Sequence, residues 1–350
     1  MIRNILICTT QVPFTSGGAE AHVAGLEAAL RAAGYNAETV ALPFRWNPPV
    51  EIMRSTLMWR LLNLAESNGK PVDLVIGMKF PAYAVAHPHK VLWIIHQHRS
   101  AYNLWGTEFD DLSTHPEGVQ VRDFVRRCDQ KFLNEARKIF ANSETVAKRL
   151  RRHNGLESET LYHPPPRFEK LFSSRLGDFI FCPSRLEPQK RPELLIETMR
   201  FVRAPVKLLL AGAAADFAPY ESLVRKHNLE QRVQLLGYVN DERIIEFYAN
   251  ALAVAYTPFD EDLGYVTLEG MLSGRPVVVS KDSGGPTEFV EDRSTGYVVA
   301  PEPREIAAVI DELHGNRSRA RVMGERGLER VRSLNLSWRR IVERLISAAS

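Results

Sequence analysis

Two glutamates, Glu261 and Glu269, bracket a glycine in the stretch EDLGYVTLE, which follows the apolar run ALAVAYTPF. If that run is a strand, Glu261 lies in the loop at its carboxyl end, and a helix begins at Gly264. The first amides of such a helix, those of Gly264, Tyr265 and Val266, have no acceptor within the helix and carry the positive end of its dipole. The stretch therefore predicts an anion site that suits a diphosphate.

The two carboxylates would lie on either side of this anion site. An ionised carboxylate only accepts hydrogen bonds, so each glutamate can bind a pair of hydroxyls, as on a ribose or a hexose. A sugar, a diphosphate and a ribose in a row describe a nucleotide sugar. The competing interpretation is that a glutamate early in a helix only complements the helix dipole. A metal bound by Asp260 and Asp262 is a further alternative, which the neighbouring amides disfavour.

Two basic residues and a glycine pair extend this hypothesis. Arg185 and Lys190 lie between the apolar run DFIFCPS and a helical segment, where they could neutralise a diphosphate. Gly17 and Gly18 open a helical segment after the run NILICTT, and their amides could approach the phosphates or the reacting sugar. Taken singly, the cations could be solvated surface residues and the glycines a simple turn.

Short apolar runs that alternate with segments of helical periodicity predict the fold. Runs without polar alternation indicate parallel strands covered on both faces. They recur in both halves of the chain, as NILICTT, DLVIG, VLWII and KIFANS and then as DFIFCPS, VKLLLAG, VQLLG, ALAVAYTP and PVVVS. Three prolines in YHPPPRF place a linker at about residues 164–174. We expect an α/β protein with two doubly wound, Rossmann-like parallel-sheet domains that face a central cleft.

Two segments of helical periodicity carry core predictions. The first ends at Gly34, and its apolar face comprises Val23, Leu26, Leu30 and Ala33. In the second, EIMRSTLMWRLLNLAE, the spacing favours core positions over a membrane anchor for Met53, Leu57, Leu61 and Leu64.

The composition bounds the function classes. The chain has 350 residues, 45% hydrophobic and 25% charged, with a net charge of +3. This is typical of a globular protein long enough for two cores, and the basic surplus is too small to indicate nucleic-acid binding. Three scattered cysteines, Cys8, Cys128 and Cys182, indicate reduced thiols and a cytoplasmic protein. The apolar run at the amino end is too short for a signal peptide, and no run reaches the ~18 residues of a membrane span.

Histidines cluster near one predicted strand. His96 and His98 follow VLWII, and His87 and His89 precede it. Each pair could bind a metal if both rings lay on one face, but no carboxylate or cysteine cluster has matching spacing. We therefore predict no metal, and polar residues at strand ends are the simpler interpretation.

The segment RSAYNLWGTEFDDLSTHPEG combines aromatic rings with carboxylates. Sugar rings stack on aromatic faces and their hydroxyls bind carboxylates, so Tyr102, Trp105 and Asp110, together with His98 just before this segment, could line an acceptor site. A surface loop anchored by its tryptophan is the alternative. Basic residues that follow could face anionic lipid or form a solvated helix face, and they are Arg122, Arg126, Arg127, Lys148, Arg149, Arg151 and Arg152.

In this order, the motifs GGAE, SRLEPQK, LLLAG, VQLLGYV and EDLGYVTLEGMLSGRPVVVS, with GGPTEFV and TGYVV, resemble a known family. They are similar to the GT-B retaining glycosyltransferases of family 4, also called glycosyltransferase group 1. The resemblance implies an acceptor-binding domain over residues 1–168 and a nucleotide-sugar-binding domain over residues 169–336. A last helix at about residues 337–350 would pack back on the first domain.

The resemblance also implies roles for single residues. Glu269 would hold the ribose hydroxyls and Glu261 those of the donor sugar. Arg185 and Lys190 would neutralise the leaving diphosphate, assisted by the amides of Gly264, Tyr265 and Val266. Tyr238 and Val239 would border the base, and Gly17 and Gly18 would complete the phosphate end. His96 falls where the family has an active-site histidine, and His98 could serve instead.

The resemblance implies transfer of a hexosyl group from a nucleoside diphosphate sugar to a hydroxyl, with retention of configuration and no metal or cofactor. The donor would be GDP-mannose, at which YHPPP hints, or a UDP-hexose. The acceptor would be a glycan of surface polysaccharide or glycolipid biosynthesis, and the enzyme would be cytoplasmic, with optional peripheral contact at the inner face of the membrane. A sugar epimerase, a phosphorylase and a non-catalytic GT-B partner subunit remain alternatives. A nicotinamide dehydrogenase is disfavoured because the glycine loop is GG and not GxGxxG.

Overall fold

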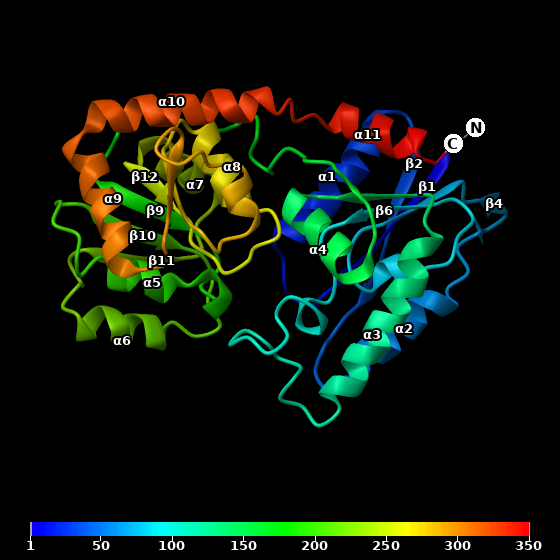
Figure 1. Cartoon of the computed structure of the whole chain (residues 1–350). Coiled ribbons are helices and arrows are strands. Elements are labelled where there is room, and N and C mark those ends of the chain that lie inside the picture. Colours follow the sequence, from blue (N-terminus) through cyan, green and yellow to red (C-terminus); the bar gives the residue numbers. More distant parts are fainter. Residues whose placement is uncertain (1, 350) are drawn as a thin grey trace. The chain divides into compact units, whose positions relative to one another are not determined.

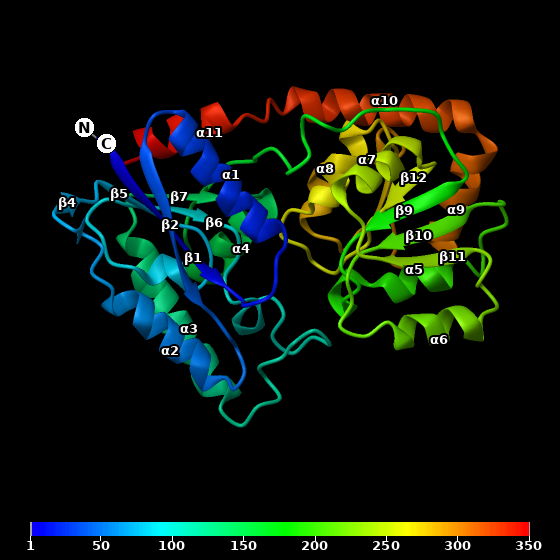
Figure 2. The ribbon, with the colours of Figure 1, turned by 180° about the vertical axis from the view of Figure 1, so that it is seen from behind.

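The computed structural model describes residues 2–349 and divides into two compact units. The first unit comprises Met1–Pro166 together with Leu336–Ser350, and the second comprises Arg167–Asn335. The sequence predicts the division after residue 168, and in the structure it follows the last of the three prolines. In Figures 1 and 2 each unit is a parallel sheet with helices on both faces, as the apolar runs predict.

The first unit has a six-stranded parallel sheet in the order β2-β1-β5-β6-β7-β8. Its strands are β1 (Asn4–Gln11), β2 (Asn36–Pro43), β5 (Leu74–Gly77), β6 (Lys90–Ile94), β7 (Lys138–Ala141) and β8 (Glu159–Thr160). A small antiparallel pair, β3 (Glu66–Ser67) and β4 (Lys70–Pro71), lies apart from it. The four runs NILICTT, DLVIG, VLWII and KIFANS thus form strands β1, β5, β6 and β7. The edge strand β2 carries no such run, because much of it is exposed.

Helices cover both faces of this sheet. They are α1 (Gly18–Ala32), α2 (Val50–Leu61), α3 (Gly118–Phe132), α4 (Glu144–Asn154) and α11 (Trp338–Ser347), with 3-10 turns η1 (Ala82–Ala84), η2 (Arg99–Ala101) and η3 (Leu133–Glu135). One strand face packs on α1 and α11, and the opposite face packs on α2, α3 and α4. The last helix therefore belongs to the first unit, where the Trp338 indole lies against Gly25 of α1.

The core predictions for two helices of the first unit have different outcomes. In α1, Val23, Leu26 and Leu30 are buried as predicted, whereas Ala33 caps the helix and is exposed. The prediction for α2 is wrong for Leu57 and Leu61, whereas Met53 and Leu64 pack against the core. That helix buries Ile52, Thr56 and Trp59 instead. Leu57 and Leu61 are exposed by 47% and 83%, and Met53 and Leu64 are partly buried. The helix is turned so that an apolar stripe faces outward.

The second unit has a six-stranded parallel sheet in the order β11-β10-β9-β12-β13-β14. Its strands are β9 (Phe179–Pro183), β10 (Lys207–Ala211), β11 (Val233–Gly237), β12 (Ala253–Ala255), β13 (Val277–Ser280) and β14 (Gly296–Val299). Five of these coincide with the predicted apolar runs. The chain progresses outward from β9 in one direction and then from β12 in the other, so the strand order reverses between these two neighbours.

Helices also cover both faces of the second sheet. They are α5 (Pro192–Thr198), α6 (Ala218–Lys226), α7 (Asp241–Asn250), α8 (Tyr265–Leu272), α9 (Pro303–Gly315) and α10 (Arg317–Ser333), with turns η4 (Pro188–Lys190) and η5 (Gly285–Glu288). One strand face packs on α5, α6 and α9. The opposite face packs on α7 and α8, where a Cβ at Gly270 would meet Val254 and Val277 at 3.1 Å. This close approach sets how deep α8 lies on the sheet.

Candidate functional site

The carboxyl edge of the second sheet brings two predicted motifs together. Strands β9 and β12 are parallel neighbours, with Ile180 opposite Ala253 and Phe181 opposite Val254. The loop after β9 carries SRLEPQK, and the loop after β12 carries EDLG. Ligands in open α/β sheets bind outside the carboxyl ends of the strands, where the strand order reverses. The two motifs therefore leave the sheet at the position where such a fold binds its ligand.

A charge pair links the two loops. The Lys190 ammonium contacts the Glu261 carboxylate, and both side chains are less than one-fifth exposed. The backbone supports this contact, because the Phe259 amide donates to the Gln189 carbonyl at 2.8 Å and the Gln189 side chain returns a bond to the Phe259 carbonyl at 3.0 Å. The two loops are thus joined by an ion pair and by two hydrogen bonds between Gln189 and Phe259.

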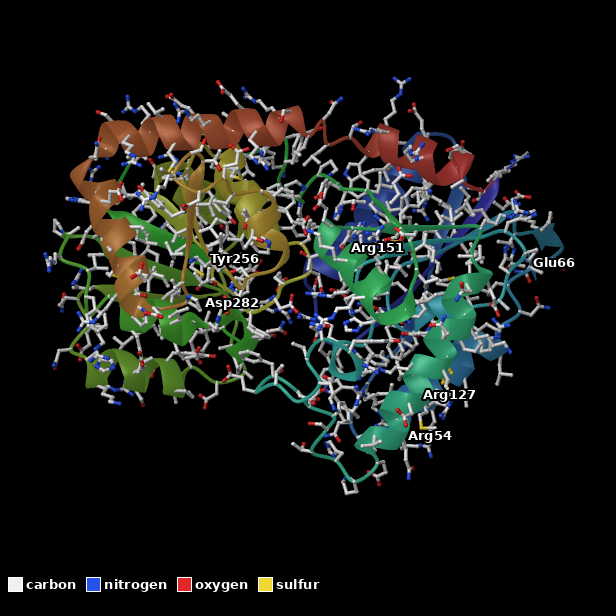
Figure 3. All side chains as sticks on the ribbon, in the orientation of Figure 1. Arg54, Glu66, Arg127, Arg151, Tyr256 and Asp282 are labelled. Carbon is white, nitrogen blue, oxygen red and sulfur yellow. The ribbon has the colours of Figure 1, made fainter. Side chains whose placement is uncertain are left out.

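Arg191 and Asp282 fix the shape of this edge. The guanidinium of Arg191 binds Asp282 at 2.7 and 2.8 Å and also donates to the carbonyls of Thr257 and Pro258. Figure 3 labels Asp282 and Tyr256, which follow the neighbouring strands β13 and β12. Arg191 is thus a structural clamp between three loops.

Arg185 lies in the same loop as Lys190 but is more exposed. Its guanidinium pairs with Glu187 at 2.8 Å, and 45% of its side chain is accessible to solvent. Burial first, and then the Glu261 carboxylate, raise the pKa of the neighbouring Tyr256, while Arg185 opposes this rise. Arg185 is therefore within electrostatic range of Tyr256, which lies close to Gly264. Its partner Glu187 is 43% exposed, so another anion could replace Glu187 at the guanidinium.

Helix α8 begins as the sequence predicts. Gly264 caps it with φ of 83° and ψ of 73°, a left-handed conformation that glycine adopts without strain. A Cβ at this position would lie 2.7 Å from Pro286 and 3.1 Å from Tyr256, so the backbone approaches its neighbours closely. The amides of Tyr265 and Val266 follow in the first turn, where helix geometry provides no internal acceptor. Gly274, with φ of 63°, lies just past the carboxyl end of the helix.

Glu269 lies in the second turn of α8 and is almost fully buried. One carboxylate oxygen accepts from the Arg167 guanidinium at 2.9 Å and the other from the Tyr248 hydroxyl at 2.8 Å. Burial raises the pKa of Glu269, and the two donors oppose that rise. The sequence analysis did not identify Arg167 or Tyr248, which are 102 and 21 residues away from Glu269. An arginine next to the three prolines is the one sequence signal that could have drawn attention.

Tyr238 and Val239 follow β11, the edge strand of the same sheet. The Tyr238 side chain is 85% exposed, whereas Val239 is partly buried. The Gly212 amide after β10 donates to the Gly237 carbonyl at 2.8 Å, which fixes the backbone just before the tyrosine. An exposed aromatic ring on a fixed backbone can stack on a planar base. It lies two strands away from the loop that carries Lys190.

In the first unit, the glycine pair also lies where the strand order reverses, because β1 is flanked by β2 and β5. Gly17 caps α1, and Gly18 is its first residue. The Glu20 carboxylate, in the first turn, accepts from the Lys79 ammonium at 2.8 Å. Burial acts to raise the pKa of Glu20. The Lys79 ammonium and the backbone amides of Gly17 and Glu20 outweigh burial and hold this pKa below its usual value. The sequence analysis did not identify this Lys79–Glu20 pair, which occupies part of the helix end.

The two histidines after β6 lie beyond the end of the strand. The carbonyl of His96 accepts from the Phe80 amide at 3.3 Å, and its ring nitrogen Nδ1 lies 2.8 Å from the Gln97 carbonyl. The ring of His98 packs on Phe80 with centroids 5.1 Å apart. Burial lowers the pKa of His98 to about 4, although Asp111 opposes the shift. His96 is half-buried and His98 is a neutral, inward-facing ring, so the geometry suits His96 better for contact with a ligand.

Besides His98, the acceptor candidates Tyr102, Trp105 and Asp110 also have structural partners. The Tyr102 side chain is 5% exposed, and its hydroxyl donates to Asp129 at 2.8 Å. Trp105 packs under the Arg122 guanidinium at 4.3 Å. Asp110 accepts the backbone amides of three turn residues, Gly106, Leu112 and Ser113. A buried Tyr102 cannot present its ring to a sugar in this conformation, which favours the anchored surface loop for this segment.

The ring nitrogens of His87 and His89 point to backbone. His87 Nε2 lies 3.1 Å from the Val72 carbonyl, and His89 Nδ1 lies 2.9 Å from the Asp73 carbonyl. Over residues 2–349, no group of three or more His, Cys, Asp or Glu side chains has the geometry of a metal site.

Residues 168–330, nearly all of the second unit, match the profile of the family described as "Glycosyl transferases group 1". Solved structures match the whole chain. Sucrose-phosphate synthase from Thermosynechococcus elongatus has a TM-score of 0.76 at 19% identity, over 99% of this chain and 100% of its own. Anabaena Alr3699/HepE, solved with UDP and glucose, has a TM-score of 0.68 at 18% identity, over 99% of both chains. The chain therefore has the GT-B fold, and its second unit matches the glycosyltransferase group 1 profile that the sequence motifs resemble.

Curated relatives match over shorter stretches. The D-inositol 3-phosphate glycosyltransferase of Nocardia farcinica is 26% identical over 250 residues, which is 63% of this chain and 54% of that protein. The human alpha-1,3/1,6-mannosyltransferase ALG2 is 31% identical over 184 residues, 48% of this chain and 44% of that protein. The Dictyostelium discoideum ALG2 is 34% identical over 107 residues, 31% of this chain and 25% of that protein. The chain thus spans about half or less of the length of these relatives.

Proposed function

We propose that this protein is a retaining hexosyltransferase of family 4 that takes its sugar from a nucleoside diphosphate donor and passes it to a hydroxyl acceptor. One observation carries the proposal. The Lys190–Glu261 pair lies in the two loops that leave the second sheet where its strand order reverses, and α8 begins four residues after Glu261. A diphosphate at this edge meets a cation and a helix amino end, and a sugar attached to it meets a carboxylate.

The chemistry follows from an exchange of partners. When a donor binds, its diphosphate takes the Lys190 ammonium away from Glu261, and the released carboxylate accepts hydroxyls of the sugar. As the bond between the anomeric carbon and the phosphate oxygen breaks, negative charge grows on the diphosphate. Lys190, Arg185 and the amides of α8 stabilise that charge, and Glu269 holds the ribose. Attack from the same face, with the leaving phosphate taking the acceptor proton, retains the configuration without a metal or a cofactor.

The choice between GDP-mannose and a UDP-hexose has support on both sides. Two of the relatives described above are named as mannosyltransferases, and Alr3699/HepE was solved with UDP-glucose. Thermal-shift titration distinguishes these two donors, because the bound nucleotide raises the melting temperature. The ligands to compare are GDP-mannose, UDP-glucose, UDP-N-acetylglucosamine and the corresponding diphosphates. A sugar donor and its own diphosphate should both stabilise the protein. If no nucleoside diphosphate shifts the melting temperature, the proposal fails.

The other GT-B functions give different products. A transferase releases the nucleoside diphosphate in proportion to the acceptor glycosylated, and NMR of the new bond shows the anomeric configuration of the donor. Epimerisation of the sugar without any acceptor would indicate an epimerase, and release that requires inorganic phosphate would indicate a phosphorylase. Donor binding with neither hydrolysis nor transfer would indicate a partner subunit. Inversion at the anomeric carbon would contradict the retaining mechanism.

The outward stripe of α2 supports a peripheral membrane contact at the cytoplasmic face. Leu57, Met58 and Leu61 are 47%, 51% and 83% exposed, and Val50 at the start of the helix is 39% exposed. Arg54 lies in the same stripe. Helices that present apolar and basic side chains together bind anionic bilayers. Within residues 2–349, no helix combines the length and apolar character that crossing a bilayer requires.

Basic residues on the neighbouring helices contribute unequally to such a surface. Figure 3 labels Arg127 of α3 and Arg54 of α2, two helices that share one core cluster. Several of the other predicted cations have partners in the protein: Arg126 donates to the Ala101 carbonyl, Lys148 pairs with Glu144 and Arg151 pairs with Glu157. The stripe on α2, and not the full basic set, is therefore the surface to test.

Sedimentation with vesicles of phosphatidylcholine alone or with one-third phosphatidylglycerol tests this contact. The wild-type protein should sediment with the anionic vesicles. The double variant Leu57→Glu, Leu61→Glu should stay in the supernatant, and Val322→Glu on α10, 44% exposed in the second unit, should behave as wild type. Equal sedimentation of all three proteins would contradict the contact.

A further inference from the structure

Arg167 is the residue whose position the sequence leaves unexplained. It directly follows the three prolines and is the first residue of the second unit. Its guanidinium joins two carboxylates: Nη1 lies 2.9 Å from Glu269, and Nη2 and Nε lie 2.7 and 3.0 Å from Asp241. Asp241 is the first residue of α7, just past Tyr238 and Val239. One side chain therefore connects the carboxylate expected on the ribose with the turn expected on the base.

The two carboxylates differ in what they need from Arg167. The Asp241 side chain is 65% exposed and is well solvated without a partner. The Glu269 side chain is 4% exposed, so water does little to stabilise its charge. A buried carboxylate favours its neutral form unless a cation is close. The Arg167–Glu269 contact is thus the one that changes the chemical state of a side chain.

The charge on Glu269 determines what it can bind. An ionised carboxylate accepts at two oxygens, whereas a protonated one has turned one oxygen into a donor. Arg167 donates one hydrogen bond to one carboxylate oxygen and Tyr248 donates one to the other. Each oxygen can therefore accept a further hydrogen bond. The two hydroxyls on adjacent ribose carbons can each donate to one oxygen of such a carboxylate. Protonation of Glu269 would leave one of these hydroxyls without an acceptor.

We propose that Arg167 is a positioning residue of the donor site, which keeps Glu269 ionised and aimed at the ribose hydroxyls and anchors it to the start of α7. This proposal rests on the proposed function, because it takes Glu269 as the ribose ligand. Arg167 acts through Glu269 and does not itself contact the reacting atoms. It also explains why an arginine occupies the end of a proline linker, where any polar residue would satisfy the backbone.

The other ionisable groups around Glu269 do not change charge between pH 6 and pH 8.5. Burial raises the pKa of Tyr248 and that of Tyr265, both of which also feel the Glu269 charge. Burial raises the pKa of Cys182, behind Tyr248, to about 12. Arg167 stays charged, because Glu269 and Asp241 hold its pKa above the ordinary value against the effect of burial. A pH-dependent change of ribose recognition in this window therefore reports on Glu269.

The test compares a nucleoside diphosphate with its 2′,3′-dideoxy analogue by calorimetric titration at pH 6, 7 and 8.5. GDP or UDP is used, whichever wild type binds more tightly. The dissociation constant of the dideoxy analogue divided by that of the nucleoside diphosphate measures what the ribose hydroxyls contribute. The phosphates titrate alike in both ligands and cancel in this ratio. In wild type this ratio should stay constant with pH. In Arg167→Met it should be clearly lower at pH 6 than at pH 8.5, because a buried carboxylate without its cation takes up a proton as the pH falls.

Three further proteins make the outcome decisive. Arg167→Lys should restore most of the ratio at pH 6, and Glu269→Gln should show a low ratio at every pH. Arg243→Met removes an exposed arginine of α7 that pairs only with Glu246 in its own helix, and should match wild type. A ratio in Arg167→Met that equals wild type, or that falls equally at all pH values, would overturn the proposal. Failure of wild type to bind any nucleoside diphosphate would instead overturn the proposed function.

Discussion

Replacement of Gly264 by alanine tests the anion site at α8 most sharply. A Cβ on a left-handed residue costs roughly 1–2 kcal/mol. At Gly264, with φ of 83°, that Cβ would also lie 2.7 Å from Pro286, closer than real Cβ contacts come, and 3.1 Å from Tyr256, which is a tight contact. The backbone must therefore shift. The rest of α8 cannot follow, because Gly270 is already packed on β12 and β13, so the shift falls on the first turn.

The expected loss of affinity follows from what the first turn contributes. An anion at a helix amino end gains up to about 2 kcal/mol in a partly buried geometry. Loss of this contribution would weaken diphosphate binding by at most about 30-fold, since 1.4 kcal/mol corresponds to a factor of ten. The nucleoside without phosphates should bind equally well before and after the substitution. Calorimetric titration of the diphosphate and the nucleoside measures both quantities.

Gly34→Ala is the matched control. Gly34 has φ of 89°, and a Cβ there would meet nothing within 4 Å. This substitution should cost the same strain, about 1–2 kcal/mol of unfolding free energy, and leave nucleotide binding unchanged. If Gly264→Ala binds the diphosphate as wild type does, or loses nucleoside and diphosphate affinity equally, the reasoning about the helix end is refuted.

Three other substitutions test how the fold is stabilised. Burial raises the pKa of Asp129 from 3.8 to about 7. The carboxyl group therefore stabilises the fold below pH 4, and this contribution, at most about 4 kcal/mol, is lost as the pH rises to 7. In urea titrations at several pH values, Asp129→Asn should remove this fall of the unfolding free energy with pH. Asp123→Asn, at an exposed position of the same helix, should keep it. Gly25→Leu should displace Trp338, whose ring lies 2.4 Å from the added Cβ, and limited proteolysis should then release the last helix. Arg275→Met removes the donor from the carbonyls of Ser273, Ala251 and Ser174. Each lost bond costs about 1–3 kcal/mol, so the melting temperature of the second unit should fall. A melting curve like that of wild type would contradict this expectation.

Sequence reasoning works well where local chemistry fixes the backbone. The start of α8 follows from Gly264, because its positive φ angle is one that other residues avoid. The buried strands follow from their unbroken apolar runs. The edge strand β2 does not, because its half-exposed residues lack such a run.

The partners in the site could not be predicted, because they depend on contacts between distant parts of the chain. Nothing near Glu269 in the sequence indicates that Arg167 would pair with it. The stripe on α2 shows the opposite failure. Leucines at helical spacing indicate one apolar face, but the spacing does not tell whether that face is turned to the core or to the outside. Leu61, at 83% exposed, is such a residue.

A crystal structure with the nucleoside diphosphate selected by thermal shift tests the central claim most directly. The account predicts the terminal phosphate at the amino end of α8, within hydrogen-bonding distance of the Val266 amide. The Lys190 ammonium should have moved from Glu261 to that phosphate, and Glu269 should accept both ribose hydroxyls. A nucleotide bound elsewhere, or bound here with Lys190 still on Glu261 and the phosphates away from α8, would contradict the account.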